Sequence, residues 1–454
     1  MNLLEELQSL VADPKQVSTG ETILDQHSRA VTYYPPHRPD VVVFPQTKEE
    51  ISRIVAFANQ HRVPIVPFAA GSSLEGQIIP VQGGISMNMM QMNQILEIRP
   101  DDFLVRVQPG VTRNQLNEEL KKYGLFFPVD PGADASIGGM AATNASGTNS
   151  VRYGVMRDSV LGLEVVLANG QIIRTGGMSF KSSSGYHLTG MFVGSEGTLG
   201  VITEITLKVY GIPEVILAAK ACFSSIDEAG RTAEALLKSG IPIGKMELVD
   251  ERTIRAVNAY KKTNYIEAPT LFLEFNGSKT SVDHDVEIAR EIAEHGGVQS
   301  FEFETDSLAR AMLWEARHHV AFAIKASAPA KGLVSTDVCV PISELTNAIV
   351  ETRRIVDQYG MASAIFGHVG DGNYHAVLSV DESNPEEIAR MEEINSHIVD
   401  YALKKGGTCT GEHGIGLGKK KYLRQEHGDA VDIMMVIKHS LDPHGIFNPG
   451  KIFE

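Results

Sequence analysis

A strand–helix–strand pattern near the N-terminus constrains the fold more than any other feature of this sequence. Residues 41–44 form a short apolar run, Thr47 is followed three residues later by Glu50, and residues 64–68 form a second apolar run. The Thr-Glu spacing is typical of a capped helix start, so the three segments predict a βαβ unit. No Gly-x-Gly-x-x-Gly motif follows the first strand, which disfavours an NAD-binding Rossmann fold.

Three loops rich in Gly, Ser and Ala accompany the predicted strands of this first region. They are AGSSLEGQ at 70–77, VDPGADASIGGMAATNASGT at 129–148 and FVGSEGTLG at 192–200. Backbone N–H groups in such loops approach a ligand closely and can hold phosphate without Lys or Arg. A single loop of this kind is usually only a turn, but three in one region indicate a dinucleotide-binding domain.

The rest of the chain reads as a second domain of a different type. The pair Asn169-Gly170 predicts a hairpin, 201–209 alternates as a strand, and Gly211, Ile212 and Pro213 then interrupt the pattern. Helices and strands alternate beyond this point, which favours an α+β domain on an antiparallel sheet. We therefore expect domains at 1–212 and 213–430, with 431–454 returning to the first domain.

Charge and cysteine content exclude several classes of protein. A formal net charge of −15 works against nucleic acid as a partner. No apolar run reaches the roughly 18–20 residues that cross a bilayer, so we expect no transmembrane segment and leave peripheral membrane contact open. Cys222, Cys339 and Cys409 lie far apart in the sequence, which argues against a disulfide framework and favours a cytoplasmic location.

Two histidines flank the turn HVGDGNYH at 368–375, and the loop TGEHGIG supplies an adjacent Glu-His pair. His368, His375 and Glu412 form a ligand set that leaves a divalent metal ion one open position, as catalytic sites require. If Glu412 binds the metal, His413 faces another way and can act as a base. The alternative is a pair of hydrogen-bonded loops at a domain contact.

The segment LWEARHHVAFAI at 313–324 places Arg317 one helical turn beyond Leu313 and Trp314. A cation that emerges from an apolar helix face can bind a substrate carboxylate through two hydrogen bonds. It can equally be a surface arginine whose aliphatic part covers apolar neighbours. These residues alone leave both interpretations open.

Taken together, these segments resemble the FAD-linked 2-hydroxyacid dehydrogenases of the vanillyl-alcohol oxidase superfamily. The motifs PFAAGSSLEGQ, ADASIGGMAATNASGTNSVRYG, GSEGTLGVITE, GHVGDGNYH, TGEHGIG and FNPGKIF occur in the order of that family, and the resemblance begins near Arg38 and reaches the C-terminus. It implies an α+β fold in which an FAD-binding domain of two subdomains precedes a ferredoxin-like substrate domain with an antiparallel sheet.

The resemblance also implies roles for individual residues. His413 would be the catalytic base, Arg317 would bind the substrate carboxylate, and Asn448 would lie near the isoalloxazine. His368, His375 and Glu412 would bind zinc or manganese. The first loop contains no histidine to tether the flavin, so we expect non-covalent FAD. The implied FAD-binding residues are Ala70, Gly71, Ser72, Ser73, Leu74, Gln77, Pro131, Asp134, Ser136, Ile137, Gly138, Gly139, Thr143, Asn144, Gly147, Glu196, Gly197, Gly200, Val201, Ile202 and Asn448.

Two departures from the family pattern narrow the expected substrate. Hydroxyglutarate dehydrogenases carry a lysine and an asparagine for the second carboxylate, and Ser335 and Val377 occupy the matching positions here. An unpaired buried carboxylate costs several kcal/mol, which favours a monocarboxylate such as D-lactate, with glycolate as the alternative.

The reduced flavin needs an electron acceptor, which we expect to be a quinone, a cytochrome, an electron-transfer flavoprotein or an iron–sulfur subunit. Three cysteines are too few for an iron–sulfur cluster within this chain. The chain could also be a glycolate oxidase catalytic subunit that works with iron–sulfur partners, or a non-catalytic flavoprotein subunit that requires them. A metallohydrolase is the alternative from another class, because His₂Glu sites also activate water, but it leaves the three Gly-rich loops unexplained.

Overall fold

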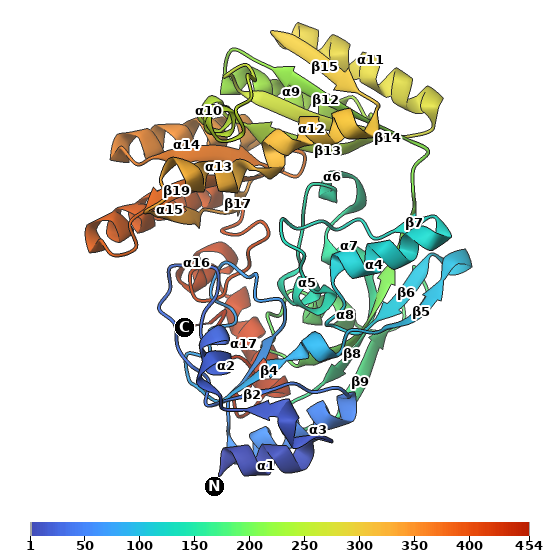
Figure 1. Cartoon of the computed structure of the whole chain (residues 1–454), viewed down its shortest axis with the longest axis vertical. Coiled ribbons are helices and arrows are strands. Elements are labelled where there is room, and N and C mark those ends of the chain that lie inside the picture. The colour runs from blue at the N-terminus through green and yellow to red at the C-terminus, as the bar shows by residue number, and fades with distance from the viewer. Residues whose placement is uncertain (1, 454) are drawn as a thin grey trace. The chain divides into compact units, whose positions relative to one another are not determined.

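The computed structural model describes residues 2–453 and divides the chain into two compact units. Unit 1 comprises Met1–Ser146, Gly154–Ile212 and Glu412–Glu454, and unit 2 comprises Gly147–Tyr153 and Pro213–Gly411 (Figure 1). The chain passes from unit 1 to unit 2 after residue 212. It returns at residue 412, whereas the sequence predicted a return at 431.

The second difference from the predicted domains is the short segment Gly147–Tyr153, which belongs to unit 2. It contains helix α6 (Ser150–Tyr153), where the Arg152 Nη1 atom donates to the Pro242 carbonyl at 2.7 Å. The hydroxyl of Ser150 also donates to Asp371. These long-range contacts fix the segment in unit 2, and no local pattern in the sequence announces them.

The first subdomain of unit 1 is a four-stranded sheet in the order β1-β2-β4-β3, in which β2, β4 and β3 are parallel. Its elements are α1 (Leu3–Leu10), β1 (Val17–Ser18), α2 (Glu21–Gln26), β2 (Val41–Val43), α3 (Lys48–His61), β3 (Ile65–Phe68) and β4 (Ile85–Asn88). Thr47 and Glu50 cap α3 as their spacing predicts. Leu7 of α1 and Ile51 of α3 are buried in the same apolar core.

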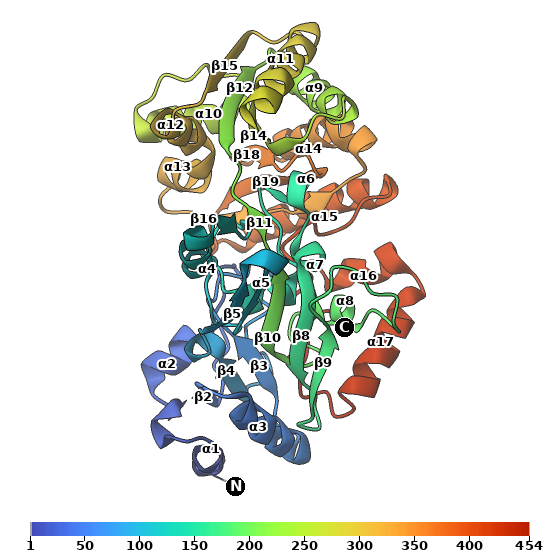
Figure 2. The same ribbon diagram turned by 90° about the vertical axis from the view of Figure 1, so that its right-hand side faces the viewer.

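The second subdomain is a five-stranded antiparallel sheet in the order β5-β6-β10-β8-β9 (Figure 2). Its strands are β5 (Ile95–Arg99), β6 (Leu104–Val107), β8 (Val160–Val166), β9 (Ile172–Gly176) and β10 (Val201–Lys208), with β7 (Leu125–Phe126) and β11 (Tyr210–Gly211) as a separate pair. The helices of this part are α4 (Arg113–Leu120), α5 (Ile137–Thr143), α7 (Met156–Ser159), α8 (Leu188–Phe192), α16 (Lys420–His427) and α17 (Ala430–Leu441). The hairpin predicted from Asn169-Gly170 joins β8 to β9, and Gly170 has the positive φ that this turn requires.

Unit 2 is built on one antiparallel sheet in the order β15-β12-β14-β13-β18-β19-β16. The strands are β12 (Val215–Cys222), β13 (Ile243–Val249), β14 (Thr270–Gly277), β15 (Ser300–Glu304), β16 (Gly332–Ser335), β17 (Val338–Cys339), β18 (Ser363–Gly367) and β19 (Asn373–Val380). The first four have the strand order of a ferredoxin-like fold, and β18, β19 and β16 extend that sheet.

Helices cover both faces of this sheet. Figure 2 shows α10, α12 and α13 on one side and α9, α14 and α15 on the other. Their bounds, with α11, are α9 (Ile226–Lys238), α10 (Glu251–Lys261), α11 (Lys279–His295), α12 (Ser307–His318), α13 (Val320–Ser327), α14 (Leu345–Tyr359) and α15 (Pro385–Lys404). Between residues 2 and 453, no helix combines the length and the apolar character needed to cross a membrane.

Candidate active site

Unit 1 contains a cavity of about 430 Å³ that most of the predicted FAD-binding residues line. A cavity of this size lies within the range of ligand pockets. Strand β3 leads directly into the first Gly-rich loop. The second segment was predicted to be a loop throughout, but part of it forms helix α5, whose first turn is capped by the Ser136 side chain. The predicted residues on the cavity wall are Ala70, Gly71, Ser72, Ser73, Leu74, Gln77, Pro131, Ser136, Gly138, Gly139, Thr143, Glu196, Gly197, Gly200, Val201, Ile202 and Asn448.

Four of the predicted FAD-binding residues do not line this cavity. Asp134 is exposed and accepts a hydrogen bond from the Asn114 backbone N–H, which shapes its own loop. Ile137 is fully buried in the apolar core. Asn144 ends α5 in the left-handed region and accepts from the Arg157 backbone N–H. Gly147 lies in unit 2.

The sequence did not single out the apolar part of the cavity wall, which includes Val31, Phe68, Ile78, Met89 and Pro109. An apolar residue beside a ligand gives the same sequence signal as one in the core. The sequence also did not show that position 138 requires glycine for a steric reason. A Cβ added at Gly138 would lie 2.4 Å from the Pro109 Cβ. Among the described residues of the wall there is no Lys or Arg. A pyrophosphate here would therefore be held by backbone N–H groups, as the loop composition predicts.

Asn448 joins the C-terminal segment to two of the cavity loops. Its side-chain amide donates to the backbone carbonyls of Gln77 at 3.0 Å and Glu196 at 2.7 Å. Its own backbone N–H donates to the Ile65 carbonyl on β3. Asn448 is only 2% exposed, so it organises the wall of the cavity from a buried position.

Glu196 holds the loop that carries the predicted base. Its carboxylate accepts from the backbone N–H groups of Ile415 at 2.7 Å and Gly416 at 2.8 Å. Burial raises the pKa of Glu196 to about 7, against the lowering effect of these two donors. Lys451 is buried nearby, and burial lowers its pKa to about 8.

The structure brings His413 to the wall of the same cavity, together with Glu412. The His413 carbonyl accepts from the Gln77 side-chain amide at 2.7 Å, and its Nδ1 atom lies 3.9 Å from the Glu75 carboxylate. Glu75 also lies 3.4 Å from the ammonium of Lys419. A histidine in this position, with a carboxylate behind it, can take a proton from a ligand in the cavity.

The other two predicted metal ligands lie together in unit 2. His368 follows β18 and His375 lies on β19, and their ring centroids are 5.7 Å apart. The Nδ1 atom of His368 lies 2.6 Å from the Glu247 carboxylate, and that of His375 lies 3.0 Å from the Thr336 carbonyl. An Nδ1–H that donates to such an acceptor leaves the lone pair on Nε2, the tautomer in which a histidine binds a metal ion.

Arg317 lies on α12, and its Nε atom donates to Glu247 at 2.8 Å. The side chain of Arg317 is 13% exposed and that of Glu247 is fully buried. This burial argues against the surface interpretation of Arg317. The guanidinium also lies over the Phe366 ring, 4.7 Å from its centroid, and His375 contacts the same ring. The sequence reasoning missed Glu247, because a charged residue between Met246 and Leu248 in a strand has the pattern of a solvent-facing position, whereas the side chain is fully buried.

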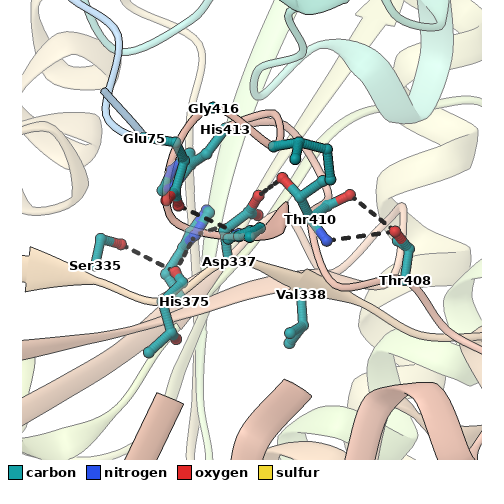
Figure 3. A network of polar contacts seen from close by, with 12 residues as sticks. Glu75, Ser335, Asp337, Val338, His375, Thr408, Thr410, His413 and Gly416 are labelled. Atoms are coloured by element: carbon teal, nitrogen blue, oxygen red, sulfur yellow. Dashed lines mark hydrogen bonds and ion pairs between the residues drawn. The ribbon is translucent and has the colours of Figure 1, made fainter. Parts of the chain in front are cut away.

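A second buried acid, Asp337, stabilises the loop that ends unit 2 (Figure 3). It accepts from the side chains of Asn373 at 2.8 Å and Thr410 at 2.7 Å. One of its oxygens lies 3.7 Å from the Nδ1 atom of His375. Asp337 therefore joins strand β19, which carries His375, to the loop that contains Thr410. Glu412 follows Thr410 by two residues in the chain.

Two family models cover most of the sequence. Residues 212–452 match the model described as FAD linked oxidases, C-terminal domain, and residues 39–176 match the FAD binding domain. The chain belongs to the FAD-linked oxidases. Its FAD-binding domain contains the cavity lined by the Gly-rich loops, so FAD is the cofactor of this flavin-dependent dehydrogenase.

Curated relatives of this FAD-linked oxidase match it over nearly its whole length. A probable mitochondrial D-lactate dehydrogenase of Danio rerio is 45% identical over 98% of this chain and 90% of its own. A mitochondrial D-lactate dehydrogenase (cytochrome) of Arabidopsis thaliana is 43% identical over 91% of this chain and 73% of its own. The glycolate oxidase subunit GlcD of Bacillus subtilis is 37% identical over 96% of this chain and 95% of its own.

Solved structures confirm the predicted fold. The structure of p-cresol methylhydroxylase with substrate bound aligns with a TM-score of 0.84, over 99% of this chain and 96% of that one, at 20% identity. An identity this low supports the fold alone. The prediction of an α+β fold with an FAD-binding domain of the vanillyl-alcohol oxidase type is thus confirmed for this FAD-linked oxidase.

Proposed function

We propose that this enzyme oxidises a D-2-hydroxy monocarboxylate, with D-lactate as the preferred substrate and pyruvate as the product. The observation that carries this proposal is the group of side chains around Phe366 in unit 2. Arg317 lies over this ring, and His375 contacts both it and His368. The buried guanidinium of Arg317 can bind the carboxylate of such a substrate. The two histidines, with lone pairs on Nε2, can bind a metal ion that acts on the adjacent hydroxyl.

Each residue has a proposed role in the reaction. Arg317 binds the carboxylate and fixes the orientation of Cα, and His413 removes the proton of the 2-hydroxyl. Bound FAD supplies the acceptor for the hydride that leaves Cα. Because His413 lines the cavity of the FAD-binding domain, the base belongs to the unit that holds the cofactor.

We further propose a divalent metal ion, zinc or manganese, as a second cofactor. The sequence predicts His368, His375 and Glu412 as its ligands. The donor set fits, because the Nδ1 contacts of both histidines leave the Nε2 lone pair for a metal. When bound, such an ion lowers the pKa of a hydroxyl group, which eases the removal of its proton.

The preference for a monocarboxylate is supported by Ser335 and Val377. These residues are direct partners across strands β16 and β19. Val377 is 5% exposed and packs in an apolar cluster with Trp314 and Ile324. A second carboxylate at this position would meet a hydroxyl and an apolar surface, and its desolvation would cost several kcal/mol.

For the electron acceptor we propose a separate molecule, either a quinone, a cytochrome, an electron-transfer flavoprotein or an iron–sulfur subunit. The name of the Arabidopsis relative supports a cytochrome. We also propose a cytoplasmic location, which rests on three widely separated cysteines.

The second candidate function is that of a glycolate oxidase subunit with iron–sulfur partners, which the Bacillus relative supports. Membership of the FAD-linked oxidases argues against a metallohydrolase.

The test is the visible spectrum of the purified protein under anaerobic conditions, recorded with D-lactate, L-lactate, glycolate and D-2-hydroxyglutarate in parallel. We expect flavin bands that bleach fastest with D-lactate. Faster bleaching with glycolate would favour the second candidate, and a flavin that none of these acids reduces would refute 2-hydroxyacid oxidation.

A further inference from the structure

We propose that Glu247 is a positioning residue that orients the metal ligand His368 and the carboxylate-binding Arg317 at the same time. This inference rests on the proposed function and deepens it. One carboxylate oxygen of Glu247 lies 2.6 Å from the Nδ1 atom of His368, and the other accepts from the Nε atom of Arg317 at 2.8 Å. The two residues assigned to metal and substrate therefore share one anchor.

The register of the sheet explains why Glu247 reaches His368. Strand β13 pairs with β18 so that Leu248 lies opposite Gly367. The next step of this antiparallel register brings Glu247 opposite the residue that follows β18, which is His368. Arg317 approaches from α12, so residues from three separate elements meet at one carboxylate.

Burying the carboxylate of Glu247 with its two partners lowers the stability of the fold, so this group of residues needs an explanation other than stability. Glu247 is fully buried, and the side chains of His368 and Arg317 are 9% and 13% exposed. Well-packed apolar residues of similar volume often stabilise a protein as much as a buried ion pair or more. Because the carboxylate of Glu247 contacts two predicted site residues, we infer that its role is to orient their side chains.

Asp250, at the end of the same strand, shows the contrasting case. It is also fully buried and also pairs with an arginine, Arg353. However, it accepts from the backbone N–H groups of Thr253 and Ile365, so it caps α10 and ties that helix to β18. The carboxylate of Glu247 instead contacts two side chains of the predicted site, His368 and Arg317.

The chemistry requires a carboxylate at this position. His368 and Arg317 both present N–H donors, and only a carboxylate offers an acceptor to each. In Glu247→Gln one of the two donors would face the amide NH₂ group. If that donor is His368, its Nδ1 must accept, the proton moves to Nε2, and the lone pair that binds a metal is lost. If it is Arg317, the guanidinium loses its anchor.

The experiment compares the FAD-loaded wild type, Glu247→Gln and a control, Glu274→Gln. Glu274 lies on the neighbouring strand β14, is 13% exposed in its side chain and lies 3.8 Å from Lys245. Zn²⁺ affinity is measured by competition with a chelator at fixed pH, and KM and kcat are measured with D-lactate. We expect Glu247→Gln to bind Zn²⁺ about 10–100-fold more weakly, the usual effect of losing an outer-shell partner, and to show a raised KM. FAD content should stay unchanged, and Glu274→Gln should match the wild type.

A double variant separates positioning from general damage. In the Arg317→Ala background, and with Zn²⁺ at a saturating concentration, Glu247→Gln should raise KM no further, because Glu247 acts on the carboxylate through Arg317. An additive effect would contradict this half of the inference. If Glu247→Gln does not fold, Glu247→Asp keeps the charge but shortens the reach, and a weakened Zn²⁺ affinity with normal FAD content is expected again.

Two outcomes distinguish the inference from the proposed function. Wild-type Zn²⁺ affinity and KM in a folded Glu247 variant would overturn the inference and leave the proposed function standing. If the wild type takes up no metal and no hydroxyacid reduces its flavin, both the inference on Glu247 and the proposed function are wrong. This measurement is made on the wild type before any variant is prepared.

Discussion

Glu196 gives the sharpest prediction for stability, because it is buried and carries a shifted pKa. Its pKa is about 7 in the folded protein and 4.5 in an exposed glutamate, and burial is the main cause. The charged groups that act on it are Glu75, which raises the pKa, and Lys451, which lowers it. Between pH 4.5 and 7 the unfolded chain has released this proton and the folded chain retains it.

The sign of the effect follows from this difference in bound protons. Stability falls with rising pH wherever the folded state binds more protons, so Glu196 weakens the fold between pH 4.5 and 7. The gap between the two pKa values corresponds to about 3 kcal/mol. Glu196→Gln does not titrate. The unfolding free energy of the variant minus that of the wild type should therefore rise by about 3 kcal/mol between pH 4.5 and 8.

The assay is urea unfolding of the FAD-loaded proteins, followed by the flavin fluorescence that rises when unit 1 releases its cofactor. Glu164→Gln is the matched control. Burial raises the pKa of Glu164, but hydrogen bonds from Lys48 and Arg174 outweigh it and hold the pKa below 4.5. The unfolding free energy of this control minus that of the wild type should not change with pH above pH 5. A flat or falling difference for Glu196→Gln would refute the reasoning and show that the backbone donors keep this carboxylate ionised.

Three further variants test the sites of the two units. His368→Ala should lose divalent metal and activity while FAD stays bound, as shown by metal analysis and the flavin spectrum; full turnover would contradict the metal role. Arg317→Ala should raise KM and lower kcat together in steady-state kinetics, because the carboxylate contact serves both ground and transition states, and an unchanged KM for D-lactate would exclude that contact. Gly138→Ala should destabilise unit 1 by about 1–3 kcal/mol in urea unfolding and reduce FAD loading, since the new Cβ would meet Pro109 at 2.4 Å. An added Cβ at Gly132 meets nothing within 4 Å, so Gly132→Ala is its control, and equal effects would contradict the steric argument.

The features that could be predicted from the sequence are those that depend on residues close together in the chain. Thr47 and Glu50 cap a helix because their spacing alone satisfies its first N–H groups. Asn169-Gly170 makes a hairpin for a similarly local reason. The Gly-rich loops could be assigned to a ligand because their composition leaves backbone N–H groups accessible, which is a property of the local sequence.

Features that depend on distant pairing could not be predicted. Glu247 meets His368 only through the register of β13 and β18, and it meets Arg317 only through the packing of α12. Asp134 and Asn144 belong to the right loop, yet their side chains hold the loop itself. The return to unit 1 at residue 412 is fixed by Glu196, more than 200 positions earlier in the chain.

The order in which the chain passes between its two units has a consequence for synthesis. Unit 1 begins with the first residues and is completed only by Glu412–Glu454. That last segment supplies His413 and Asn448 to the cavity, together with the two backbone donors that Glu196 binds. A ribosome must therefore make the whole of Pro213–Gly411 before the flavin pocket has all its walls. Any truncation that removes residues 412–454 leaves the cavity without the predicted base, so tight FAD retention requires that this segment has been made.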